Sequence, residues 1–190
     1  MPTLKTKDLE INYIDEGKGP VILLIHGNYS SSYWWNVVVT ALKGEFRVIA
    51  PDLRGRGKTK GETGKETIEL YADDLRSFID SLELTDPVHL VGHSLGGSIV
   101  TQYSIDNQHM VRSMTLIDTG WVAGDIPDAI ADKERLSEVA EQPAAVKMVL
   151  ETVIAPTYPK NEEWVKMVAE SLMQSQATTI SSGEVLKKWK

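Results

Sequence analysis

Residues 88–97 have the sequence VHLVGHSLGG, a short apolar run that ends in Gly-His-Ser-Leu-Gly. This is the G-x-S-x-G pattern in the context that it requires, a strand followed by a sharp turn and a helix. Gly92 and Gly96 let the strand and helix backbones approach each other, because a side chain at either position would collide. The pattern therefore predicts a turn that holds the hydroxyl of Ser94 clear at the end of a sheet.

Apolar runs typical of buried parallel strands occur on both sides of this turn, at residues 21–25, 46–50 and 111–117. The clearest helical periodicity spans residues 67–82, and a further helix is expected over residues 95–107. Strands that alternate with helices through short links indicate the α/β class. We therefore predict a mostly parallel sheet with helices on both faces.

The segments between these elements are assigned from local pattern. Residues 3–16 alternate loosely and predict two short strands or a hairpin, and residues 33–42 predict a helix behind a run of serines that can cap it. Residues 52–65 are rich in Gly, Lys and Arg and are predicted to form a loop.

The character of the chain changes at Trp121, after which strand patterns stop and helical segments follow one another. We therefore expect two regions, the N-terminal part of an α/β core over residues 1–120 and an all-helical cap over residues 121–190. The later helices are expected to begin at Pro143, at Asn161, and at Thr178 or Ser181.

Composition excludes several classes of protein. The chain has 190 residues, no cysteine and a net charge of −7, which argues against nucleic acid or an anionic membrane as a partner. The N-terminus is polar and no apolar run could cross a bilayer, so a cytoplasmic location is expected. The four histidines lack metal-site spacing and no dinucleotide-binding glycine pattern occurs, so no metal and no cofactor are expected.

Three motifs in a fixed order carry a family resemblance: His26-Gly27-Asn28, the sequence PDLRGRG at residues 51–57, and the glycine-flanked Ser94. Together they resemble the N-terminal part of an α/β-hydrolase-fold enzyme, and the helical region resembles the cap that many members insert after the sixth strand. The resemblance implies a capped serine hydrolase, similar to esterases and lactonases, that acts on a small ester-like molecule.

The resemblance also implies roles for individual residues. Ser94 would attack a carbonyl carbon and form an acyl-enzyme, and the backbone N–H groups of Leu95 and Asn28 would receive the oxyanion. His26 would hold the loop of residues 26–28, here called the oxyanion loop, rather than act as a base.

Two further positions are candidates for the substrate pocket. His93 is the variable residue of the turn, and it would either line the pocket or serve packing. The aromatic residues that follow the oxyanion loop, Tyr29, Tyr33, Trp34 and Trp35, either line the pocket or pack a helix, and Tyr29 is expected closest to substrate.

The sequence supplies no obvious base for Ser94. Asp118 ends the sixth strand and is a possible acid, but the one histidine after Ser94 is His109, roughly 22 Å further along a helix. Family members carry their acid and histidine on later strand–helix units, so roughly 60–80 residues of core are expected to be absent here. The strand over residues 111–117 would then have an open edge, and we expect self-association or a complementing C-terminal segment.

Three hypotheses follow for function. The first is hydrolysis of a small carboxylic ester, lactone or thioester through Ser94, and the second is a non-catalytic pseudo-hydrolase that binds a small molecule. The third is an inactive fragment. Dehalogenase and epoxide-hydrolase relatives carry an aspartate at the turn, so Ser94 argues against both of those chemistries.

Overall fold

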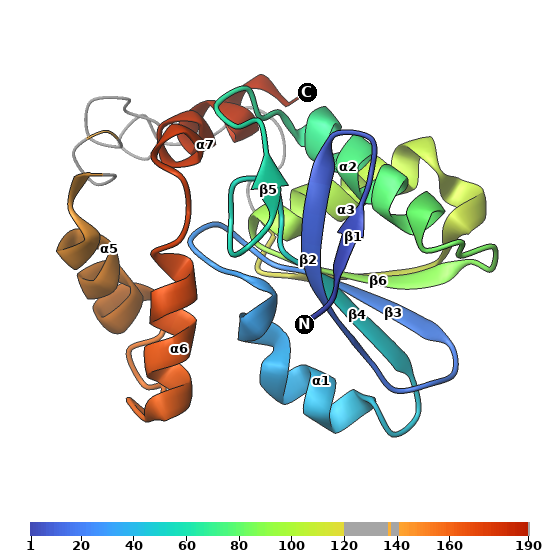
Figure 1. The fold of residues 1–190 in the computed structure, drawn as a ribbon, viewed down its shortest axis with the longest axis horizontal. Coiled ribbons are helices and arrows are strands. Elements are labelled where there is room, and N and C mark those ends of the chain that lie inside the picture. Colours follow the sequence, from blue (N-terminus) through green and yellow to red (C-terminus); the bar gives the residue numbers. More distant parts are fainter. Residues whose placement is uncertain (120–136, 138–140, 190) are drawn as a thin grey trace.

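A computed structural model of the protein describes residues 1–119, 137 and 141–189. Its centre is a seven-stranded sheet in the order β1-β2-β4-β3-β6-β7, with the short β5 paired to β2 (Figure 1). The strands are β1 (Thr3–Lys5), β2 (Leu9–Glu16), β3 (Val21–Ile25), β4 (Arg47–Pro51), β5 (Lys60–Gly61), β6 (Val88–His93) and β7 (Val111–Ile117).

The sheet is mostly parallel, as predicted, because β4, β3, β6 and β7 all run in one direction. β2 is antiparallel to its neighbours and forms the expected hairpin with β1. One difference from expectation is β5, which lies in the predicted loop and pairs Lys60 with Glu10. Two residues are too few to give a strand pattern in sequence.

Helices cover both faces of the sheet, as predicted (Figure 1). α2 (Ile68–Ser81) and α3 (Leu95–Asp106) lie on one face, and α1 (Asn36–Leu42) lies on the other. α1 is preceded by a 3-10 turn, η1 (Ser32–Trp35), so the helix expected over residues 33–42 is in two parts. Another 3-10 turn, η2 (Gln108–Met110), links α3 to β7.

The described part of the later region is helical: α5 (Pro143–Val149), the π-helical η4 (Leu150–Ile154), α6 (Glu162–Ser171) and α7 (Gln176–Lys188). Pro143 begins α5 and Asn161 caps α6, as expected. The prediction for the last helix was wrong, because Ser175 caps α7 by accepting the N–H of Thr178. Thr178 and Ser181 lie inside the helix, where their hydroxyls bind Glu66 of the first region.

Two parts of this later region pack on the first. Val185 and Trp189 belong to the large core between the sheet, α2 and α3, and the indole N–H of Trp189 donates to Gln102 of α3 at 2.8 Å. A separate small core contains Trp164 of α6, with Tyr29 and Trp34 packed against it. The expected boundary at residues 120 and 121 lies outside the described residues, so the proposed division remains a prediction.

β7 lies at the edge of the sheet formed by the described residues, as the sequence predicted. Its large apolar side chains are exposed, with fractions of 39% for Met114, 44% for Leu116 and 42% for Ile117. By contrast, Leu23, Leu24 and Ile25 of β3 are completely buried. The covered core therefore ends at β6.

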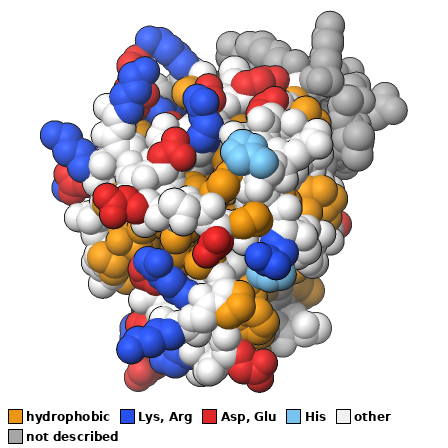
Figure 2. Space-filling view, turned by 90° about the vertical axis from the view of Figure 1, so that its right-hand side faces the viewer, with side chains coloured by type: hydrophobic (Ala, Val, Ile, Leu, Met, Phe, Trp, Pro, Cys, Tyr) orange, Lys and Arg blue, Asp and Glu red, His pale blue; other side chains and the backbone are white. Residues whose placement is uncertain are grey.

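The face in Figure 2 has mixed chemical character: acidic side chains lie between the Lys and Arg side chains, and hydrophobic side chains reach the surface at its centre. Among the helices that the structure describes, none has the length and apolar character needed to cross a membrane.

Candidate active site

Ser94 occupies a strained turn between β6 and α3, with φ of 50° and ψ of −120°. A Cβ atom added to Gly92 would lie 2.4 Å from the carbonyl oxygen of Gly96, and one added to Gly96 would lie 2.2 Å from that of Ile25. Both distances are shorter than a side chain can tolerate, so the two glycines are required by close approach of strand and helix. The turn has the local geometry that the sequence pattern predicts.

The oxyanion loop lies directly against this turn. A Cβ atom added to Gly27 would lie 3.0 Å from the Cβ of Ser94 and 3.0 Å from Nδ1 of His93. Leu95 is the first residue of α3, so its N–H is one of the groups that a helix leaves without an intrahelical partner. The structure therefore brings Ser94 and Leu95 next to the loop that carries Asn28.

His26 fixes this loop from inside the protein. Its Nε2 accepts the N–H of Leu53 at 3.1 Å, so Nδ1 carries the proton and donates to the carbonyl oxygen of Gly27 at 2.8 Å. Burial, together with a smaller effect of the charge of Arg56, lowers the pKa of His26 to about 3. His26 is therefore neutral at physiological pH and ties two loops together.

Asn28 and Tyr29 are also held by distant segments. Oδ1 of Asn28 accepts from Nη2 of Arg56 at 2.7 Å, and the N–H of Tyr29 donates to Oε1 of Gln174 at 3.1 Å. Tyr29 has a positive φ of 50°, and its side chain packs against the small core that contains Trp164. The structure thus places the Tyr29 side chain against the later helices.

A cavity of about 220 Å³ lies beside the turn and is lined by His26, Ser30, Trp34, Trp35, His93 and Ile117. It contains two of the aromatic residues expected near substrate, Trp34 and Trp35, and it also contains His93. Burial lowers the pKa of His93, and the nearby carboxylate of Asp118 opposes that shift.

Asp118 lies close to Ser94 through the backbone. The N–H of Ser94 donates to the carbonyl oxygen of Ile117 at 3.0 Å, and Asp118 is the next residue, with a positive φ of 44°. Its side chain is exposed. His109 lies in η2, beyond the far end of α3, so the structure does not bring it to Ser94.

Sequence reasoning missed a group of buried charges in residues 52–66. Asp52 accepts from the side chain of Asn12 and from the N–H groups of Ser32 and Lys58. A Cβ atom on Gly57 would lie 2.3 Å from the Asp52 carboxylate. The alternation of arginine and glycine at residues 54–57 is the sequence signal that could have indicated a loop folded around its own polar groups.

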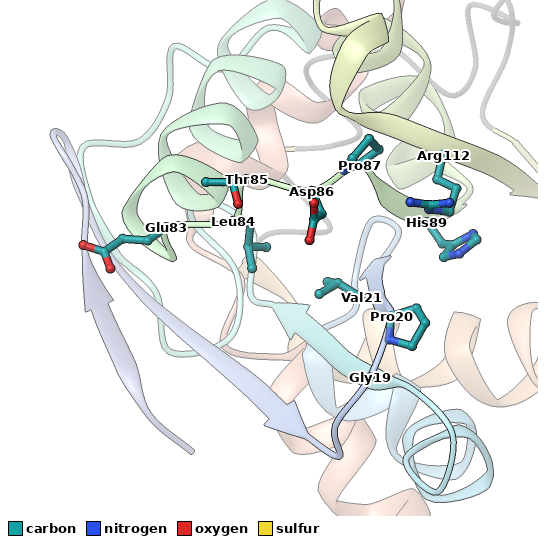
Figure 3. Close-up of a pocket in the computed structure, with 10 residues that line it drawn as sticks. All are labelled: Gly19, Pro20, Val21, Glu83, Leu84, Thr85, Asp86, Pro87, His89 and Arg112. Atoms are coloured by element: carbon teal, nitrogen blue, oxygen red, sulfur yellow. The ribbon is translucent and has the colours of Figure 1, made fainter.

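A second cavity, of about 640 Å³, lies at the opposite end of the sheet (Figure 3). It is bounded by the segments before β3 and β6 and by His89 and Arg112, whereas Ser94 follows the other end of β6. This cavity is therefore separate from the candidate active site. Among the described residues, no group of three or more potential ligands could hold a metal ion.

The fold and the turn at Ser94 define the class of this protein. A family model described as the alpha/beta hydrolase fold matches residues 20–148. The chain therefore belongs to the α/β-hydrolase fold family.

Individual relatives give a finer picture. The chain is 37% identical over 109 residues to a soluble epoxide hydrolase of Corynebacterium sp., a match that covers 57% of this chain and 37% of the relative. It is 32% identical over 122 residues to a cis-3-alkyl-4-alkyloxetan-2-one decarboxylase of Shewanella oneidensis, a match that covers 63% of this chain and 38% of the relative. The chain thus spans little more than a third of the length of these curated relatives.

Among solved structures, the chain is similar to a thermophilic esterase from Thermogutta terrifontis, with 26% identity and a TM-score of 0.75. That match covers 94% of this chain and 71% of the esterase. Nearly all of this chain therefore has a counterpart in the esterase, whereas part of the esterase has none here.

Proposed function

We propose that the protein hydrolyses a small carboxylic ester, lactone or thioester through an acyl-enzyme on Ser94. The observation that carries this proposal is the juxtaposition of Ser94, at a strained turn that starts a helix, with the oxyanion loop. Attack of the Ser94 hydroxyl on a carbonyl would place the developing negative charge near the N–H groups of Leu95 and Asn28.

The chemistry of the nucleophile favours acyl transfer. A serine hydroxyl forms an ester with an acyl group, whereas the family resemblance implies an aspartate at this turn in epoxide hydrolases and dehalogenases. The structural match to the esterase named above covers 94% of this chain. The oxetanone relative is named as a decarboxylase of a cyclic ester, a compound of the same class as the proposed substrates.

A base must accept the proton of Ser94 for efficient turnover. We propose that it comes from a complementing segment, either a separate chain or further residues of a longer polypeptide. This agrees with the length comparison and with the open edge of β7. Losing the base in another serine hydrolase lowers kcat by about six orders of magnitude, so the 190-residue chain alone would be a slow enzyme.

In the 190-residue chain alone, we propose that the edge of β7 pairs with a second copy. The carbonyl of Ile117 faces β6, so the backbone groups of alternate residues, including Met114 and Leu116, face the open edge. Antiparallel pairing about Thr115 would set Met114 opposite Leu116. Apolar pairs of this kind stabilise neighbouring strands.

The direct test uses 4-nitrophenyl acetate and follows nitrophenolate release at high protein concentration. We expect a slow release that is lost in Ser94→Ala and unchanged in His109→Asn, an exposed histidine remote from the site. Mass spectrometry should detect an acetyl group on Ser94. Equal release by the wild type and Ser94→Ala, with no acetylated Ser94, would contradict the proposal.

The cavity of about 220 Å³ favours one alternative, a pseudo-hydrolase that binds a small molecule without turnover. Its walls include two tryptophans and His93, which suit a compact aromatic or acyl ligand. Calorimetry would distinguish this function, because binding of an uncleaved ester should then be equal in the wild type and Ser94→Ala.

A further inference from the structure

Arg56 is a buried cation that stands directly behind the oxyanion loop. Its side chain is 1% exposed, and Nη2 donates to Oδ1 of Asn28 at 2.7 Å. Nη1 donates to the hydroxyl of Tyr71 and to the carbonyl oxygen of Arg54, and the guanidinium lies 5.4 Å from the centre of the Tyr71 ring. Arg56 is therefore held rigidly, and one of its contacts is the side chain of a candidate oxyanion residue.

None of these partners carries a negative charge. Within the part of the chain that the structure describes, Arg56 forms no ion pair, and its Nε has no hydrogen-bond partner. The neighbouring Arg54 shows the contrast, because its guanidinium binds both oxygens of Asp74, at 2.8 and 2.6 Å. A buried charge without a counter-ion is costly for folding, so stability gives no reason for a cation at position 56.

The field of this charge reaches both sides of Asn28. Arg56 lowers the pKa of His26, which precedes the loop glycine, and it lowers the pKa of Tyr29 against the upward effect of burial. Both effects have the sign expected for a positive charge nearby. A negative charge that forms beside the N–H of Asn28 would lie in the same field and would be stabilised by it.

We propose that Arg56 is a positioning residue that fixes Asn28 and supplies the positive charge for the oxyanion. The hydrogen bond to Oδ1 holds the Asn28 residue in the loop whose preceding glycine, Gly27, lies against Ser94. The charge acts in a water-poor environment, where electrostatic stabilisation is stronger than in solvent. This inference rests on the proposed function of Ser94, and it assigns no direct contact between Arg56 and substrate.

The test uses phenylboronic acid on the 190-residue protein. The Ser94 oxygen adds to boron and forms a tetrahedral boronate anion, with the hydroxyl proton released to solvent. The adduct can be followed by boron NMR and its affinity by calorimetry. Benzamide, which is neutral and planar and of similar size, measures binding that needs no anion stabilisation. Ser94→Ala shows which part of the boronate affinity depends on the adduct.

Three variants separate charge from shape. Arg56→Met removes the charge and the hydrogen bond, and Asn28→Asp keeps the hydrogen bond but neutralises the charge. Each should weaken boronate binding by at least about ten-fold and leave benzamide binding within about two-fold; loss of one oxyanion-hole donor costs about 10²–10³ in rate. Arg56→Lys keeps the charge and should bind boronate more tightly than Arg56→Met.

The matched control is Arg47→Met, which removes an arginine paired with Asp15 away from the turn and should leave both affinities unchanged. If Arg56→Met does not unfold cooperatively, the smaller Asn28→Asp change decides the test. If Asn28→Asp binds boronate as tightly as the wild type, the proposed role of Arg56 is overturned and the proposed function of Ser94 is not. Absence of a Ser94-dependent adduct in the wild type would overturn the proposed function as well, so the two failures are distinguishable.

Discussion

β3 and β7 both flank the strand that leads to Ser94, yet they differ in almost every physical respect. Leu23, Leu24 and Ile25 of β3 are completely buried, whereas the large apolar side chains of β7 are about two-fifths exposed. Each strand ends beside Ser94. β3 leads into the oxyanion loop, and β7 leads to Asp118.

This difference separates the two tasks that the proposed hydrolysis at Ser94 would require. The oxyanion side is held by His26, by the contact of Arg56 with Asn28, and by Gln174. On the side of β7, the turn is held by the β6–β7 ladder and by the backbone hydrogen bond from Ser94 to Ile117, and the side chain of Asp118 is exposed. The half of the site proposed to stabilise charge is therefore preorganised, and the half proposed to move protons is open to solvent.

The largest expected effect is on stability and compares the two strands directly. Leu23→Ala deletes a completely buried side chain and should lower the free energy of unfolding by about 2–5 kcal/mol. Leu116→Ala, on the exposed edge, should cost less than about 1 kcal/mol. Urea denaturation of both variants measures the contrast, and equal losses would show that β7 is covered in solution.

The next effect concerns the contact between the turn and β3. Gly96→Ala would place a Cβ atom 2.2 Å from the carbonyl of Ile25, so the helix must move away from the strand. We expect a loss of about 1–3 kcal/mol or more in the free energy of unfolding. Gly44→Ala is the matched control, because a Cβ atom there meets nothing within 4 Å. Thermal denaturation of the pair should show a lower midpoint for Gly96→Ala alone.

A third prediction concerns the pH dependence of stability from His26. Burial lowers its pKa from 6.5 to about 3, so between these values the unfolded chain binds a proton that the folded protein does not. The contribution of His26 to the free energy of unfolding is complete above pH 6.5. It is lost as the pH falls toward 3, at roughly 1.4 kcal/mol per pH unit. His26→Asn should reduce the slope of the free energy of unfolding against pH between pH 3 and 6.5 by the equivalent of one proton, as measured by urea denaturation. Identical profiles for the wild type and His26→Asn would contradict this.

The smallest effect on stability, but a clear one on assembly, is expected at the open edge. Leu116→Lys should change the free energy of unfolding of the monomer by less than about 1 kcal/mol, because the side chain is exposed there. It should nevertheless disrupt pairing of β7 with a second copy, since like charges would approach the two-fold axis. Light scattering after gel filtration should show a dimer for the wild type and a monomer for the variant. A monomeric wild type would remove the proposal of self-association.

The sequence predicted those elements that depend on local pattern. All strands except β5, the helices α2 and α3 and the turn at Ser94 follow from apolar periodicity and from two glycines, which are properties of adjacent residues. The start of α7 was predicted too late because Thr178 and Ser181 are good capping residues in isolation. In the fold, their hydroxyls donate hydrogen bonds to the carboxylate of Glu66, which lies more than a hundred residues earlier.

The buried charges were missed for a similar reason. Arginines in a segment predicted as a loop are expected to be exposed. The fold buries Arg54 and Arg56 by bringing Asp74, Tyr71 and Asn28 to them. The candidate site could therefore be predicted at the nucleophile and at the oxyanion loop. The supporting residues could not, because each is defined by a partner that is distant in sequence.

The anchoring of Trp189 on α3 has a consequence for the order in which the protein is made. Val185 and Trp189 complete a core whose other members end at Val111, so that core stays unfinished while the intervening residues are synthesised. At roughly 5–20 residues per second, this interval lasts several seconds. During that time the nascent chain exposes the apolar surface that Trp189 later covers.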